Sequence, residues 1–132
     1  MKVAFVQNFW YEYLGVMSIS AYIKKEGHEA RVFINGWEKD LVAAVGDFDP
    51  DVIAFPTYSG SQGWVLTKAR ECKKRFRKLI VLGGPHATFF PDIISEKGVD
   101  IVCRGEGEEP MLELLSALAG GKSIENIANL WV

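Results

Sequence analysis

The chain has 132 residues, of which 48% are hydrophobic and 24% charged, and its formal net charge is −2. This length suits one domain with a buried core, and the composition excludes a disordered chain or a collagen-like repeat. The charge gives no reason to expect a nucleic-acid partner. No apolar run reaches the ~20 residues of a membrane span, so we expect no membrane partner either.

Neither the first residues nor the cysteines suggest export. Met1 to Val6 reads as a strand, because a signal peptide would need a longer apolar core and a cleavage site. Cys72 and Cys103 lie far apart and form neither a C-x-x-C motif nor a metal-binding pattern. We interpret both as reduced, partly buried thiols and expect a cytoplasmic protein.

The first part of the chain alternates short apolar runs with segments of helical periodicity. An aromatic loop from Phe9 to Tyr13 follows the first run, and Gly27 ends the first helix as a C-terminal cap. Val16, Ile19 and Ile23 recur on one face of that helix. The pattern predicts strands at Lys2–Gln7, Glu29–Ile34 and Val52–Phe55, with helices at Leu14–Glu26 and Glu38–Phe48.

The second part continues the same alternation. Pro110 falls in the first turn of the last helix, where its missing N–H does no harm. The inner faces of the two long helices are expected to carry Val65, Ala69, Cys72 and Phe76, and then Met111, Leu114, Leu115 and Leu118. We expect helices at Gln62–Arg77, Asp92–Glu96 and Glu108–Leu118, and strands at Leu79–Leu82 and Val99–Cys103.

Five such alternations without a repeat or linker predict an α/β fold, a doubly wound five-stranded parallel sheet in a three-layer sandwich. The expected arrangement is flavodoxin-like (Rossmann-like), with strand order 2-1-3-4-5 and a switch point between the first and third strands. Residues 1–121 form this domain. After Gly120 and Gly121 the pattern changes, and we expect 122–132 to begin a bridge to a downstream domain. The loops that meet at the carboxyl edge are Asn8–Tyr13, Pro56–Ser61, Gly83–Phe90 and Arg104–Glu108.

Two neighbouring strands end abruptly in glycine. Gly83 and Gly84 follow one buried strand, and Gly105 and Gly107 follow the next. Missing side chains at a sheet's carboxyl edge allow a bulky ligand to lie against the backbone. Tight turns are the alternative for a single Gly-Gly-Pro. Because two adjacent strands end this way, the pattern favours a binding site.

The edge loops argue against several known chemistries. A phosphoreceiver domain needs carboxylates where this chain has Gln7-Asn8 and Pro56-Thr57. The only near match to G-x-G-x-x-G begins at Gly105 and lacks its third glycine. Ser59, Ser61 and Thr57 have His86 as a possible neighbour but no G-x-S-x-G elbow. A flavodoxin-like flavin or nucleotide site remains as an alternative.

Charged side chains allow two interpretations at two places. Glu108 and Glu109 suit the first turn of a helix, whereas Glu106 is open to either a structural or a site role. The third helix carries a basic outer face, which we interpret as solvated, with an interaction surface as the alternative. That face comprises Lys68, Arg70, Lys73, Lys74, Arg75, Arg77 and Lys78.

Two motifs together carry a family resemblance. Gly83 to Pro91 reads G-G-P-H-A-T-F-F-P, and Arg104 to Glu108 reads R-G-E-G-E. At this spacing the chain resembles the N-terminal cobalamin-binding domain of cobalamin-dependent radical SAM enzymes. Leu14–Ala30 resembles that family's first helix and second strand, and Ile124–Trp131 its bridge to the radical domain.

The resemblance implies a cobalamin-binding module that is not catalytic alone. Cobalamin would lie over the carboxyl edge, its nucleotide tail beside Gly83 and Gly84. A downstream radical SAM domain of the same chain would hold an iron–sulfur cluster and S-adenosylmethionine, for methylation or a related radical reaction. The implied cofactor-binding residues are Asn8, Tyr11, Thr57, Tyr58, Ser59, Gly83, Gly84, His86, Ala87, Thr88, Arg104, Gly105, Glu106 and Gly107.

The loop after the first strand departs from other cobalamin modules. Modules such as that of methionine synthase carry D-x-H-x-x-G there, and its histidine ligates cobalt, whereas Asn8 to Gly15 contains no histidine. His28 precedes the second strand, at the opposite edge of the sheet, and His86 follows the fourth. We therefore expect base-off cobalamin with no histidine ligand from the protein and no other metal ligand. The aromatic residues of this loop either lie beneath the corrin or pack into the core or a domain interface.

Overall fold

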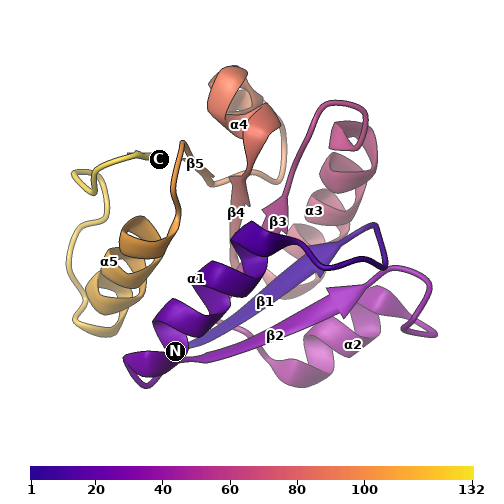
Figure 1. Cartoon of the computed structure of the whole chain (residues 1–132), viewed down its shortest axis with the longest axis horizontal. Helices are drawn as coiled ribbons and strands as arrows, with labels where there is room; N and C mark the ends of the chain where they lie inside the picture. The colour runs from indigo at the N-terminus through magenta and orange to yellow at the C-terminus, as the bar shows by residue number, and fades with distance from the viewer.

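A six-stranded sheet in the order β2-β1-β3-β4-β5-β6 forms the middle of the computed structural model, which describes residues 1–132 (Figure 1). The first five strands are parallel, and β6 pairs antiparallel with β5. The predicted α/β class and the order 2-1-3-4-5 are confirmed, with one strand more than expected. The strands are β1 (Lys2–Gln7), β2 (Glu29–Ile34), β3 (Val52–Pro56), β4 (Leu79–Gly83), β5 (Ile101–Cys103) and β6 (Leu130–Trp131).

The additional strand lies within the segment expected to begin a bridge. β6 is only two residues long, and it places Leu130 opposite Cys103 and Trp131 opposite Val102. A two-residue strand has no periodicity of its own, and its partner lies far away in the sequence. The local pattern therefore did not predict its antiparallel pairing with β5.

Helices cover both faces of the sheet and produce two cores. The apolar side chains of α1 (Leu14–Lys25) and α5 (Glu108–Ala119) pack on one face, where they surround Val3, Phe5 and Val81. Those of α2 (Leu41–Phe48), α3 (Gln62–Phe76), the short α4 (Pro85–Phe89) and the 3-10 helix η1 (Pro91–Ser95) pack on the other face. Each buried helix face removes apolar area from water, which stabilises this three-layer arrangement.

Most expected inward-facing residues are buried. Val16 and Ile23 of α1 are buried, whereas Ile19 is only partly buried because it borders a pocket. Cys72 and Cys103 are both free and buried. None of the helices combines the length and apolar character needed to cross a membrane. The long helices bury Val65, Ala69, Cys72, Met111, Leu114 and Leu115 as expected, with Phe76 and Leu118 only partly buried.

Besides β6, three elements differ from the expectation by more than one residue. α2 begins at Leu41 rather than Glu38, because the Asp40 side chain caps it by accepting a hydrogen bond from Ala43 N–H at 3.0 Å. Pro85–Phe89, expected as loop, forms α4 with proline in its first turn. β5 starts at Ile101 rather than Val99; the preceding Asp100 accepts hydrogen bonds from Ile80 N–H at 2.7 Å and Lys73 Nζ at 2.8 Å.

The basic outer face of α3 is largely paired. Four of its seven basic residues form ion pairs with nearby carboxylates. This pairing supports the interpretation of a solvated helix face, since those charges already have local partners. The pairs are Lys68–Glu71 at 2.8 Å, Arg70–Glu96 at 2.7 Å, Lys73–Asp100 at 2.8 Å and Lys78–Asp49 at 3.2 Å.

Candidate ligand-binding site

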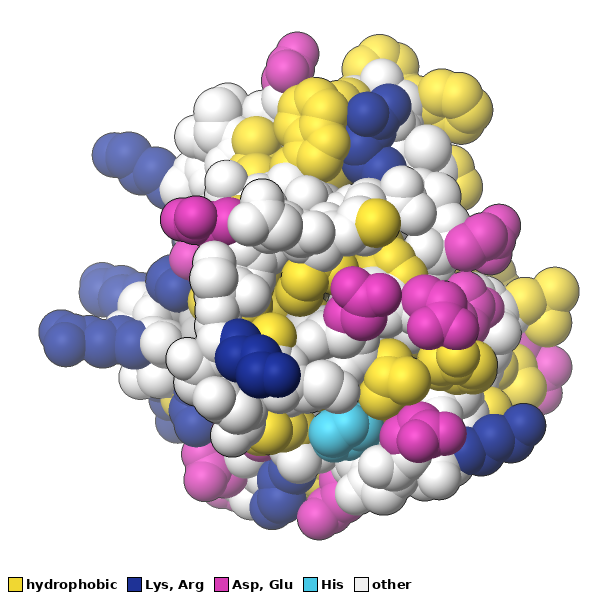
Figure 2. Space-filling model, turned by 90° about the vertical axis from the view of Figure 1, so that its left-hand side faces the viewer, with side chains coloured by type: hydrophobic (Ala, Val, Ile, Leu, Met, Phe, Trp, Pro, Cys, Tyr) yellow, Lys and Arg dark blue, Asp and Glu magenta, His cyan; other side chains and the backbone are white.

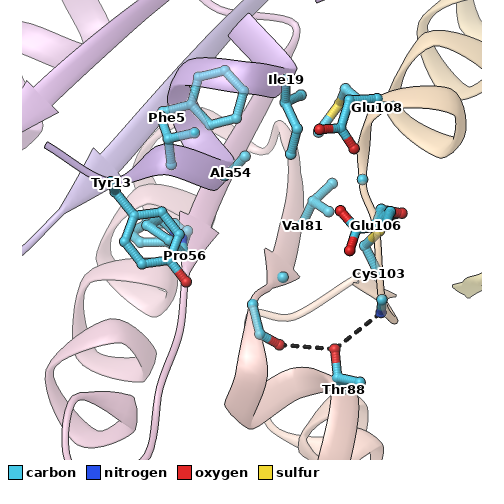
Figure 3. A pocket seen from close by; sticks show the side chains of 18 of the residues that line it. Phe5, Tyr13, Ile19, Ala54, Pro56, Val81, Thr88, Cys103, Glu106 and Glu108 are labelled. Carbon is cyan, nitrogen blue, oxygen red and sulfur yellow. Dashed lines mark hydrogen bonds between the residues drawn. The ribbon is translucent and has the colours of Figure 1, made fainter.

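A pocket of about 360 Å³ lies at the carboxyl ends of the central strands, on the face covered by α1 and α5. Its walls are mainly apolar. Figure 3 shows Phe5 and Ile19 on one side, Cys103 and Glu106 on the other, and Val81 between them. The pocket adjoins the carboxyl ends of β1 and β3, the two strands between which the strand order reverses. Open α/β sheets bind ligands at such a switch point.

The two helices above the pocket are held together by hydrogen bonds. Ser18 Oγ of α1 donates to Glu108 Oε1 of α5, and Tyr22 OH donates to Glu109 Oε1. Gly107 permits their close approach, because a Cβ there would lie 2.6 Å from Ile19 Cδ1. Glu108 and Glu109 therefore have structural partners, as their interpretation as first-turn residues suggested. Glu106 is exposed, and its carboxylate points toward the pocket (Figure 3).

The two glycines after β4 have different surroundings. A Cβ on Gly83 would meet only Cys103 Cβ at 3.9 Å, so the pocket side of this residue is open. Gly84 has φ +93°, and a Cβ there would lie 2.8 Å from the carbonyl oxygen of Thr57 and 3.1 Å from Tyr13 OH. Gly84 is thus required by the backbone, whereas Gly83 leaves space along the pocket wall.

Backbone hydrogen bonds join the loop after β3 to the loop after β4. Thr57 N–H donates to Gly83 O at 2.7 Å, and Thr57 O accepts from His86 N–H at 3.0 Å. The Thr57 hydroxyl donates to Phe55 O at 3.2 Å and is fully buried. Thr57 and Ala87 are thus buried beneath the loops that border the pocket, and they support these loops without lining it.

Thr88 connects the two glycine-containing loops. Its hydroxyl donates to Gly84 O and accepts from Gly105 N–H, both at 3.0 Å (Figure 3). Arg104 Nε donates to Thr88 O at 3.3 Å, and the Arg104 guanidinium lies 5.0 Å from the ring centre of Trp131. These contacts give the glycine loops a defined shape without side chains that would fill the pocket.

Four aromatic rings form a cluster beside the pocket. Phe9 stacks on Tyr11 at 4.7 Å and on Tyr58 at 4.6 Å, and Tyr13 lies 5.9 Å from Tyr58. The buried Gln7 fixes this loop by donating through Nε2 to Phe9 O at 2.9 Å and Tyr11 O at 3.1 Å. The aromatic cluster is therefore organised before any ligand binds.

Burial raises the pKa of two phenols and one thiol at or near the pocket. Burial and the 3.2 Å hydrogen bond to Tyr11 raise the pKa of the Tyr58 phenol, and burial raises that of Tyr13. Burial, with the Glu108 carboxylate nearby, raises the pKa of the Cys103 thiol to about 11. Both phenols and the thiol are therefore neutral at physiological pH.

Three other expected residues lie near the carboxyl edge of the sheet without lining the pocket. Asn8 Oδ1 accepts from Asn35 Nδ2 at 2.8 Å, and this contact connects the loops after β1 and β2. The exposed Ser59 hydroxyl lies 3.0 Å from His86 Nδ1, and the His86 ring lies 4.9 Å from that of Phe90. The expected residues that line the pocket itself are Gly83, Gly84, Thr88, Gly105, Glu106 and Gly107.

The apolar walls of the pocket were not predicted from the sequence. Phe5, Ala54 and Val81 occupy neighbouring parallel strands and point to the same face. Side chains alternate between faces along a strand, so this alignment could be found once the strand order was assumed. Cys103 was noted, but only as a buried thiol.

Comparison with known proteins identifies the family. The profile of the B12-binding domain matches residues 5–115, which is most of the chain. The chain belongs to the B12-binding domain family. This assignment agrees with the flavodoxin-like order of the sheet and with a pocket at the carboxyl ends of the strands.

Two longer proteins resemble this B12-binding domain. An uncharacterized methyltransferase of Pyrococcus horikoshii is 30% identical over 125 residues, covering 89% of this chain and 27% of that protein. The anaerobic magnesium-protoporphyrin IX monomethyl ester cyclase of Rubrivivax gelatinosus is 26% identical over 119 residues, covering 81% of this chain and 21% of the cyclase. The chain thus spans about a quarter or less of the length of these relatives.

The site of this B12-binding domain has features that fit one arm of a cobalamin molecule. The pocket combines apolar walls with an open glycine position at Gly83, where a Cβ would meet nothing closer than 3.9 Å. Sites for small organic ligands and cofactors are typically concave and mainly apolar, as this pocket is. Figure 2 shows the side of the molecule on which α5 and the C-terminal segment lie in Figure 1, and there acidic and hydrophobic side chains lie close together.

Proposed function

We propose that this domain binds cobalamin in the base-off state, with the nucleotide tail in the pocket beside Gly83. The observation that carries the proposal is the apolar pocket at the carboxyl ends of β1, β3, β4 and β5, in a chain of the B12-binding domain family. Its volume of about 360 Å³ lies near the lower end of small-molecule sites, so it suits one arm of a large ligand.

Different groups would contact different parts of the ligand. The backbone at Gly83 and Gly105 allows close approach, and Val81 and Phe5 provide apolar contacts for the base of the tail. The Glu106 carboxylate can accept hydrogen bonds from hydroxyl groups of the tail at the pocket mouth. The remaining rim residues expected to face the corrin and its amides are Asn8, Tyr11, Tyr58, Ser59, His86 and Arg104.

The absence of a histidine ligand to cobalt is part of the proposal. The chain has two histidines. His28 immediately precedes β2 and therefore lies at the amino edge of the sheet, about 20 Å from the carboxyl edge for a six-residue strand. His86 already contacts Ser59 and Phe90. The loop after β1 instead presents the aromatic cluster.

The wider protein is proposed from its relatives. Because one relative is named a methyltransferase and the other a cyclase, we infer a module within a larger enzyme of the cobalamin-dependent radical SAM type. A partner domain of the same chain would hold the iron–sulfur cluster and S-adenosylmethionine. Bound cobalamin would supply a cobalt centre able to carry a methyl group. The residues described here bind and orient that cofactor.

Binding of cobalamin is tested by gel filtration. The purified domain is mixed with hydroxocobalamin or with FMN, and the absorbance of the protein peak is recorded. Co-elution of pink cobalamin and absence of yellow flavin are expected; a yellow peak without pink would contradict the proposal. Electron paramagnetic resonance of the cob(II)alamin complex tests the ligation. Nitrogen superhyperfine splitting that disappears in His86→Ala would show a histidine ligand and refute that part.

A further inference from the structure

The last ten residues of the chain form a strap that closes one side of the pocket. Among residues 123–132 only Ile124, Ile127 and Leu130 are not exposed, and they recur at a spacing of three residues. All three pack in the core on the face of the sheet that α1 and α5 cover. Leu130 also lines the pocket. We call residues 123–132 the strap, and Leu130 is the part of it that forms pocket wall.

Few contacts hold the strap in place. Its backbone joins the rest of the domain through the two-residue β6 ladder and through Arg104 N–H, which donates to Asn129 O at 2.9 Å. Asn129 has φ +64°, a left-handed conformation that is uncommon outside glycine. Leu130 borders a second hollow, of about 420 Å³, as well as the pocket. A short segment with few hydrogen bonds and incomplete packing opens locally at a low cost in free energy.

Arg104 links the strap to the two glycine-containing loops. Its guanidinium lies 5.0 Å from the ring centre of Trp131, and its Nε donates to Thr88 O at 3.3 Å. The Thr88 hydroxyl in turn holds both loops through its two hydrogen bonds. Trp131 itself does not line the pocket. Release of the strap would therefore take Leu130 out of the pocket wall and separate Arg104 from its stacking partner.

We infer that docking of the strap is coupled to occupancy of the pocket. A ligand that contacts Leu130 only in the docked state binds that state more tightly, so it shifts the equilibrium toward docking. By linkage, docking raises the affinity of the pocket by the same factor. The inference rests on the proposed cobalamin function and adds a regulatory element to it, in which Ile127 and Trp131 position the wall from outside the pocket. In the larger protein proposed above, the strap would connect the pocket to the rest of the chain.

Trypsin provides a direct measure of strap release. Lys122 is exposed, and residues 123–132 contain no lysine or arginine, so one cleavage after Lys122 removes the whole strap. Cleavage requires a locally unfolded segment, so its rate follows the population of the released state. Lys122 follows α5, whose 12 residues (about 18 Å) separate it from the glycine loop after β5. Lys97, exposed in the turn before β5 at the opposite edge of the sheet, is the control site.

The experiment compares three proteins with and without saturating hydroxocobalamin, whose occupancy is read from its absorbance. They are the wild-type domain, the strap variant Ile127→Ser/Trp131→Ala and the control Trp37→Ala. Trp37 is 71% exposed and lies in the turn after the edge strand β2, away from the strap. Cleavage after Lys122 and after Lys97 is followed by mass spectrometry, and the dissociation constant of hydroxocobalamin is measured for each protein.

In the wild-type domain, hydroxocobalamin should slow cleavage after Lys122 by about tenfold, the effect of one apolar side chain buried against the ligand, and leave cleavage after Lys97 unchanged. The strap variant should be cleaved faster after Lys122 in the absence of ligand. It should also bind hydroxocobalamin severalfold more weakly, with the same factor of about tenfold as the limit set by linkage. The Trp37→Ala control should change neither cleavage nor affinity.

Three results would overturn the inference. The first is an equal rate of cleavage after Lys122 with and without bound hydroxocobalamin. The second is equal slowing at Lys122 and Lys97, because the ligand would then stabilise the whole domain rather than the strap. The third is unchanged affinity of a strap variant whose faster cleavage shows that the strap is released. Failure of the wild-type domain to bind hydroxocobalamin would instead refute the proposed function.

Discussion

The two glycines after β4 provide a matched pair of substitutions. Gly84→Ala places a Cβ 2.8 Å from Thr57 O and forces a left-handed φ of +93° on an L-residue. The φ strain costs about 1–3 kcal/mol, and relief of the clash adds to it, because the contact is with backbone that is fixed by the hydrogen bonds of Thr57. We expect a loss of about 2–4 kcal/mol in the free energy of unfolding.

The matched change is Gly83→Ala, whose Cβ meets only Cys103 Cβ at 3.9 Å. Its effect on stability should stay within about 0.5 kcal/mol. Urea unfolding followed by circular dichroism measures both variants. With an m-value of about 2 kcal/mol/M, the midpoint should fall by about 1–2 M for Gly84→Ala only. Equal midpoints for the two variants would refute the reasoning.

Three further predictions concern the surroundings of the pocket. Gln7→Leu removes the donor to two loop carbonyls and should lower the free energy of unfolding by about 1–3 kcal/mol. It should also weaken cobalamin binding severalfold, and unchanged affinity would contradict the supporting role of the buried amide. Leu130→Ala should lower the free energy of unfolding by about 2–4 kcal/mol and also weaken cobalamin binding, because Leu130 is 8% exposed and lines the pocket. Differential scanning calorimetry measures the stability, and isothermal titration calorimetry measures the affinity. Burial raises the pKa of Cys72 and Cys103 from 9.0 to about 11, so the folded state holds these protons more tightly than the unfolded state; the free energy of unfolding should therefore fall as pH rises from about 9 to 11. A Cys72→Ala/Cys103→Ala variant that shows the same fall would disprove this cause.

The sequence predicted the fold where local signals were strong. Short apolar runs such as Leu79–Leu82 end in glycine and alternate with helices of 3.6-residue period. This alternation predicted the parallel order that the structure confirms. The start of α2 was wrong because the Asp40 cap outweighs the apparent periodicity. The helix at Pro85–Phe89 was missed because five residues carry too little periodicity to be recognised.

The candidate site was predicted only in part for a related reason. Glycines that directly follow apolar runs can be recognised in a sequence. The glycines that line the pocket were therefore predicted, namely Gly83, Gly84, Gly105 and Gly107. The apolar walls come from strand residues that look like any other core residue until their neighbours are known. Gly84 and Gly83 could not be distinguished from the sequence. Their difference depends on Thr57, which is distant in sequence.

The position of cobalamin in the pocket can be tested by cysteine footprinting. Cys103 lines the pocket, whereas Cys72 lies on the buried face of α3 in the other core and has a similarly raised pKa of about 11, so it serves as an internal control. The rate of iodoacetamide labelling at each cysteine is measured by mass spectrometry with and without saturating hydroxocobalamin. Cobalamin in the pocket should slow labelling of Cys103 by about tenfold relative to Cys72. Bound cobalamin with unchanged relative labelling of the two thiols would contradict it.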